Sequence, residues 1–237
     1  MHSHIHYLPL TPGFFSILVL AAVMLLILIQ LGIFRYAYLR LGVSPGAAML
    51  LLFGSLIGSY FNIPLTVLQG PPAQAGEIVD FFGMRYVVPF LDSPSTILAV
   101  NIGGAVIPAL MSAYLVLRYQ LWLRAAIATI VIAAIVHASA TPVAGMGIAV
   151  PVFVPVMATA ILALLLSREY AAPLAYIGGS MGTLLGADLL NLDKIGSLGA
   201  PIASIGGAGT FDGVFLTGIL AVLIAGIAAP AKPRPAY

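Results

Sequence analysis

The stretch SIGGAGTFDGVFLTGILAVLIAG, residues 204–226, passes from a glycine-rich segment into an apolar run within a few residues. From Gly213 to Gly226 the run has no charged side chain, and Asp212 lies immediately before it. Continued to Ala229, the run approaches the roughly 20 residues that an α-helix needs to cross a bilayer. The stretch therefore predicts a membrane-spanning helix that begins beside a carboxylate.

The composition of the whole chain supports the same class of protein. Of the 237 residues, 62% are hydrophobic and only 7% are charged, whereas about one-quarter of the residues in a soluble domain are charged. The chain contains no cysteine, which excludes disulfides, thiolate metal sites and cysteine nucleophiles. We expect the lipid bilayer to be the main partner, and nucleic acid not to be one, because nine basic residues form no patch.

The pattern of apolar runs predicts an all-α membrane protein that forms a single integral domain over residues 1–237. We expect about seven transmembrane helices, near residues 13–34, 45–68, 96–117, 124–141, 148–167, 172–190 and 210–229. Residues 69–95 form an outer loop in which two β-rich runs flank Gly83 and Met84, and this pattern predicts a small β-hairpin between helices two and three. Residues 191–209 form a second outer loop, rich in glycine and proline.

The distribution of basic residues predicts the orientation of these helices. Cytoplasmic loops carry an excess of Lys and Arg. With the N-terminus outside, seven basic residues fall on the cytoplasmic side: Arg35, Arg40, Arg118, Arg124, Arg168, Lys232 and Arg234. Arg85 and Lys194 fall outside. The sequence therefore predicts an N-out, C-in topology.

Glycines recur at four-residue spacing in the predicted helices. Gly178, Gly182 and Gly186 form such a stripe, and the pairs 54/58 and 209/213 repeat the spacing. Small residues at this spacing allow two membrane helices to approach closely. The stripe favours packing inside the bundle, and a homo-oligomer through these faces is the alternative.

Four polar residues near the predicted outer helix ends are candidate site residues: Asn101, His137, Asp188 and Asp212. An ionisable residue inside a membrane is a functional-site hypothesis by default. Asp188 ends helix six and Asp212 begins helix seven, and consecutive antiparallel helices are usually neighbours. The structural alternative is that Asp212 stabilises the positive end of the helix dipole.

These residues support two hypotheses of function. The first is an outward-facing transporter, or a binder of small molecules or ions, in which Asp188, Asp212, His137 and Asn101 hold a proton, cation or substrate. The second is an intramembrane aspartyl hydrolase acting on a peptide, in which Asp188 and Asp212 form a catalytic dyad that activates water.

Metal binding is a further question. His137 could ligate a metal together with the two aspartates, or it could be a hydrogen-bonded structural residue. The N-terminal HSHIH, residues 2–6, is a second candidate. The sequence does not identify a cofactor.

Several stretches resemble a known family: LGVSPGAAMLLLFGSLIGSYFNIPL, VNIGGAVIPALMSAYLVLR, GIAVPVFVP, GTLLGADLLNL and GAPIASIGGAGTFDGVFLTGILAVL. They are similar to the uncharacterised prokaryotic multi-pass membrane proteins catalogued as domain of unknown function 1614. The resemblance implies an integral protein of the prokaryotic plasma (inner) membrane and brings no established activity. TFDGVFLTGILAVL also looks, more weakly, like the second aspartate helix of presenilin-type intramembrane aspartyl proteases, although Asp212 here follows Gly-Thr-Phe.

Overall fold

The structure is a computed structural model. It describes residues 16, 20, 21, 23, 24, 33–69, 78–81, 84–87, 95–143, 147–151, 153–195, 202–207 and 213–228. Most of the first predicted helix, Asp212 and the N-terminal histidines lie outside this set.

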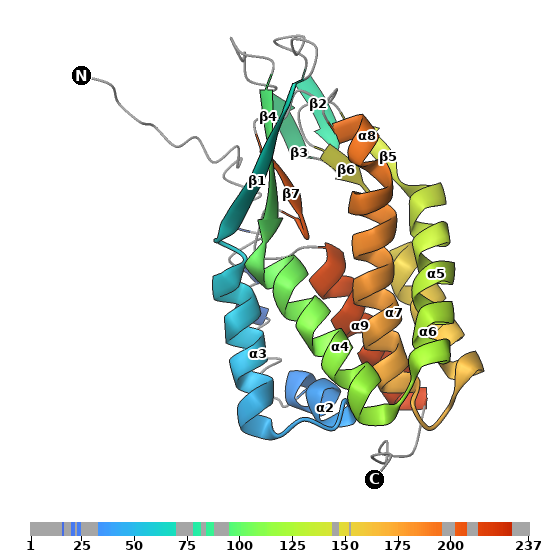
Figure 1. The fold of residues 1–237 in the computed structure, drawn as a ribbon. Helices are drawn as coiled ribbons and strands as arrows, with labels where there is room; N and C mark the ends of the chain where they lie inside the picture. Colours follow the sequence, from blue (N-terminus) through green and yellow to red (C-terminus); the bar gives the residue numbers. More distant parts are fainter. Residues whose placement is uncertain are drawn as a thin grey trace.

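Helices make up most of the described chain and run side by side beneath a small sheet (Figure 1). The α-helices are α2 (Ile33–Arg40), α3 (Pro45–Gly58), α4 (Ile107–Tyr119), α5 (Trp122–Ser139), α6 (Phe153–Leu166), α7 (Ala171–Thr183), α8 (Leu192–Ile195) and α9 (Gly213–Ala228). Two π-helical turns, η1 (Ile102–Val106) and η2 (Leu184–Asp188), and one 3-10 turn, η3 (Leu189–Asn191), extend them.

Three small sheets complete the described fold. The largest has the strand order β1 (Asn62–Gln69), β4 (Ser95–Asn101) and β7 (Ile202–Ile205). Strand β1 pairs antiparallel with β4, and β4 pairs parallel with β7. The other two are antiparallel hairpins, β2 (Ile78–Phe81) with β3 (Met84–Val87) and β5 (Thr141–Val143) with β6 (Gly147–Ala149).

The mostly helical class and the hairpin between the second and third predicted helices are confirmed, but the all-α prediction missed the other strands. Helix α3 ends at Gly58 rather than near residue 68. Pro64 cannot continue a helix because it lacks an N–H group and its ring clashes with the preceding turn. The β-branched Ile63, Thr66 and Val67 then suit the strand.

The starts of the third and fifth predicted helices are also corrected. Residues 95–101 form β4, and the helical segment starts only at Ile102, because a short apolar run does not distinguish a helix from a strand. Residues 147–149 pair as β6, and α6 begins at Phe153. Within the loop predicted at 191–209, α8 and β7 are ordered elements.

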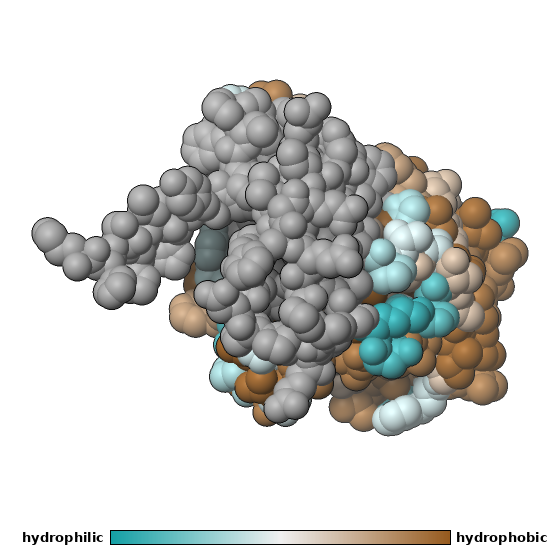
Figure 2. All heavy atoms as spheres, turned by 90° about the horizontal axis from the view of Figure 1, so that it is seen from above, coloured by the Kyte–Doolittle hydropathy of each residue, from teal (hydrophilic) through white to brown (hydrophobic). Residues whose placement is uncertain are grey.

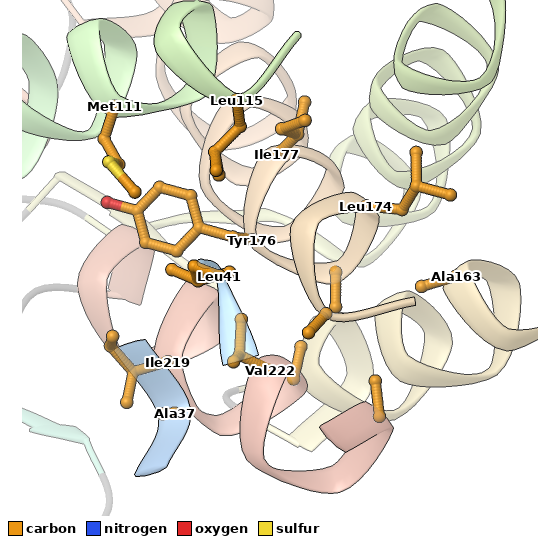
Figure 3. Close-up of a cluster of buried hydrophobic side chains, with 14 of the residues drawn as sticks. Ala37, Leu41, Met111, Leu115, Ala163, Leu174, Tyr176, Ile177, Ile219 and Val222 are labelled. Carbon is orange, nitrogen blue, oxygen red and sulfur yellow. The ribbon is translucent and has the colours of Figure 1, made fainter. Parts of the chain in front are cut away.

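Helix α7 lies at the centre of the bundle, and its residues are buried almost throughout. The face formed by Gly178, Gly182 and Gly186 packs against α5: added Cβ atoms on these glycines would meet Ala128, Ile132 and Ala133 or Val136. This stripe therefore packs within the chain. On another side of α7, Tyr176 points between Met111 of α4 and Leu41 (Figure 3).

The outer surface of the helices is apolar. Leu50 of α3, Phe153 and Leu165 of α6, and Ile227 of α9 are 76–79% exposed. Apolar side chains cover most of the surface that is not grey in Figure 2. Within the described residues, two helical segments are long and apolar enough to cross a membrane, Ile102–Tyr119 and Trp122–Ser139.

We expect Gly182→Ala to destabilise the bundle. An added Cβ would lie 2.7 Å from the Cβ and Cγ2 atoms of Ile132, and overpacking of this kind lowers the free energy of unfolding by about 1–3 kcal/mol. Gly46→Ala is the matched control, because no atom lies within 4 Å of its added Cβ. Thermal unfolding in detergent measures both, and equal melting temperatures would contradict the packing of α7 on α5.

Candidate functional site

A group of polar residues lies where the three-stranded sheet meets the helices. We define this group as the polar junction; its members are Asn62 of β1, Asn101 of β4, Asp188 of η2, and Ser204 and Gly206 of β7 and the turn that follows it. The elements converge because β4 and β7 are neighbouring parallel strands, with Ala99 opposite Ser204. Strand β4 leads directly into η1 and α4 (Figure 1).

Asn101 joins the sheet to two helical segments. It is 1% exposed, and its Oδ1 accepts a hydrogen bond of 2.8 Å from the Gly104 N–H, which caps η1. Its Nδ2 donates to the Ser59 carbonyl at 2.7 Å and to Asn62 Oδ1 at 3.0 Å. The Ser204 hydroxyl donates to the same Asn62 oxygen at 2.5 Å. Asn101, predicted as a ligand-binding residue, thus has protein partners for both amide atoms.

Asp188, by contrast, is a half-buried carboxylate held by the backbone of the turn after β7. The Gly206 N–H donates to Asp188 Oδ2 at 2.7 Å. Gly206 has φ +86°, and an added Cβ would lie 2.6 Å from the Ala105 nitrogen and the Gly104 carbonyl carbon. Only glycine can therefore bring this N–H to the carboxylate, because a side chain would collide with the backbone of η1.

The end of the helix that carries Asp188 is fixed by a residue that the sequence analysis missed. Asn191 is 1% exposed, and its Nδ2 donates to the carbonyls of Gly186 and Ala187, both at 3.0 Å. Lys194 Nζ donates to Asn191 Oδ1 at 2.8 Å. The carbonyls at a helix end lack intrahelical partners, so Asn191 satisfies two of them. The signal that the sequence offers is an asparagine shortly after a helical run.

His137 lies apart from these hydrogen bonds, in the last turn of α5. Its Nδ1 is buried and has no hydrogen-bond partner. The adjacent Val136 packs with Ala187, the neighbour of Asp188. Among the residues that the structure describes, no group of three or more His, Asp or Glu side chains could hold a metal ion. Metal binding by His137 stays a prediction.

The second predicted aspartate, Asp212, lies outside the described residues. Helix α9 contacts η1, and its Val214 belongs to the same buried apolar cluster as Leu184 of η2. Helices α7 and α9 are thus neighbours, as their order along the chain predicted.

The described residues define a mostly helical protein with an apolar exterior and a half-buried carboxylate, Asp188, at a sheet–helix boundary. Residues 56–224 match the family model described as "Protein of unknown function (DUF1614)". The chain belongs to this family, which confirms the resemblance seen in the sequence. No match was found among curated proteins or solved structures.

We expect Asn101→Ala to destabilise the protein, because it leaves the Gly104 N–H and the Ser59 carbonyl without their side-chain partner. A buried group left without a hydrogen bond costs about 1–3 kcal/mol. Thr66→Val, an exposed change on β1, is the control. Thermal unfolding would contradict the bridging role of Asn101 if both variants melted like the wild type.

Proposed function

We propose that the protein is embedded in a membrane and binds or transports a small cation or polar solute at Asp188. The observation that carries this proposal is the half-buried Asp188 carboxylate, oriented by the Gly206 N–H at the boundary between sheet and helices. A carboxylate is costly to remove from water unless it is partnered, and a neutral N–H donor leaves its negative charge available to a cation.

Membrane embedding is supported by the surface of the bundle. Large apolar side chains are exposed on several helices, which a water-exposed bundle would bury. The two helical segments of spanning length, Ile102–Tyr119 and Trp122–Ser139, are neighbours along the chain. The seven-helix, N-out topology and the prokaryotic inner-membrane location stay predictions, and they would place the polar junction toward the outer side.

The residues of the site have different roles in this proposal. Asp188 supplies the charge that attracts the cation or proton. Gly206 and Asn191 orient the Asp188 side chain and the helix end that carries it, and Asn101 holds the backbone of η1 in place. His137 and Asp212 are candidates for additional ligands. The aspartyl hydrolase with an Asp188/Asp212 dyad stays the alternative, and cleavage of a membrane peptide by the purified protein would favour it.

We expect Asp188→Asn to slow cation movement while the fold is kept, because the amide retains an oxygen that can accept a hydrogen bond from the Gly206 N–H but loses the charge. Purified protein in liposomes is given an imposed gradient of H⁺, Na⁺, K⁺ or Mg²⁺, and each liposome sample encloses a fluorescent dye selective for the imposed ion. The wild type should dissipate one of these gradients. Asp188→Asn should reduce the rate by about tenfold or more, which corresponds to an increase of at least about 1.4 kcal/mol in the activation free energy.

Asp193→Asn is the matched control, because Asp193 is an exposed carboxylate in α8, five residues away in sequence. It should retain the wild-type rate. Equal rates for Asp188→Asn and the wild type, or no movement of any of the four cations by the wild type, would contradict cation transport at Asp188.

A further inference from the structure

A groove of about 450 Å³ lies on the side of the bundle between α4, α5 and α7. The groove exists because small side chains line it: Ala109 and Ala113 on α4, and Ala125 and Ala126 on α5. Ile177 of α7 forms part of its lining and is itself buried. These three helices are in mutual contact and can be followed in Figure 1. The groove is within the 300–1,000 Å³ range of small-molecule sites.

The lining excludes a charged ligand. It contains no Lys, Arg, Asp, Glu or His side chain, and nearly all of it is aliphatic or aromatic. An ionised ligand would lose its hydration there without gaining a counter-charge. Most of the molecule bound in this groove must therefore be an uncharged hydrocarbon.

One polar atom in the wall has no partner. Ser112 is 3% exposed, and its hydroxyl oxygen is buried without a hydrogen bond in the structure. Buried hydroxyls are normally hydrogen-bonded, and Ser112 lines the groove. Thr129 brings a second hydroxyl-bearing side chain from α5. A few placed polar groups in an apolar lining are the usual means of orienting a small ligand.

We propose that this groove binds a neutral amphipathic molecule, an apolar chain with one carbonyl or hydroxyl group. The Ser112 hydroxyl, which is sealed from solvent in the structure, rotates about its Cα–Cβ bond and donates a hydrogen bond to that group. The groove is bordered by both helical segments of spanning length, so its open side faces the lipid and the ligand enters from the bilayer. This route rests on the membrane embedding proposed above. The chemistry of the ligand rests on the lining alone.

The chain provides its own reporter, because Trp122 is its single tryptophan and lines the groove. The protein is placed in phosphatidylcholine liposomes with 11,12-dibromo-2-dodecanone, whose bromine atoms quench indole fluorescence on contact. 1,2-Dibromododecane is the matched probe without a carbonyl. The ketone should quench Trp122 saturably, at a mole fraction about three- to tenfold lower than the alkane requires, the effect expected of one hydrogen bond.

Three variants test the assignment. Ser112→Ala should remove the preference for the ketone, whereas Thr159→Val should keep it, because Thr159 is a buried unpartnered hydroxyl on α6 that does not line the groove. Ala113→Phe should abolish saturable quenching by both probes, since the exposed Ala113 has room for a ring that fills the groove.

Unsaturable and equal quenching by the two probes in the wild type would overturn the proposal. An unchanged ketone preference in Ser112→Ala would overturn it as well. Neither result depends on cation movement, so a failure here is distinguishable from a failure of the function proposed for Asp188.

Discussion

The close approach of neighbouring helices to α7 is the constraint on which the rest of the structure depends. Gly182 and Gly186 leave room for Ile132 and the Ala133 backbone of α5. On another side, Gly179 lies against the backbone of Gly218 in α9. In the membrane proposed above, lipid would provide no hydrophobic force to join apolar helices, and close contact between small residues would supply the packing energy instead.

The position of the polar junction follows from that packing. Because α7 is enclosed by its neighbours, its end enters the base of the sheet, where η2 presents Asp188 to Gly206. The polar groups of this boundary satisfy one another through short hydrogen bonds, with Asn101 as the central residue. The same arrangement leaves Ile177 as part of the lining of an apolar groove. The one central helix thus leads to the Asp188 carboxyl group at its end and lines an apolar groove along its side.

Much of this arrangement was readable in the sequence, and the parts that were not have physical causes. The four-residue spacing of the glycines predicted the close-packed face of α7. The long apolar runs without charged residues predicted the helices. The sequence predicts helix ends at 62–68 and 96–101, where the structure has strands, because a short apolar run does not distinguish a strand from a helix. The pairing of β4 with β7 joins residues about a hundred positions apart, and local patterns do not predict it. The sequence predicts Asp188 as a site residue, but its hydrogen-bond partner Gly206 is a backbone donor that no side-chain motif reveals.

Accessibility to a water-soluble reagent measures whether lipid surrounds the helices. The chain has no native cysteine, so single-cysteine variants can be made without background. Ile130 lies within α5 and is 65% exposed, whereas the exposed Glu169 lies in the turn before α7. In lipid nanodiscs, the account predicts that a charged maleimide labels Glu169→Cys rapidly and labels Ile130→Cys only after denaturation. Equally rapid labelling of both in the folded protein would contradict it.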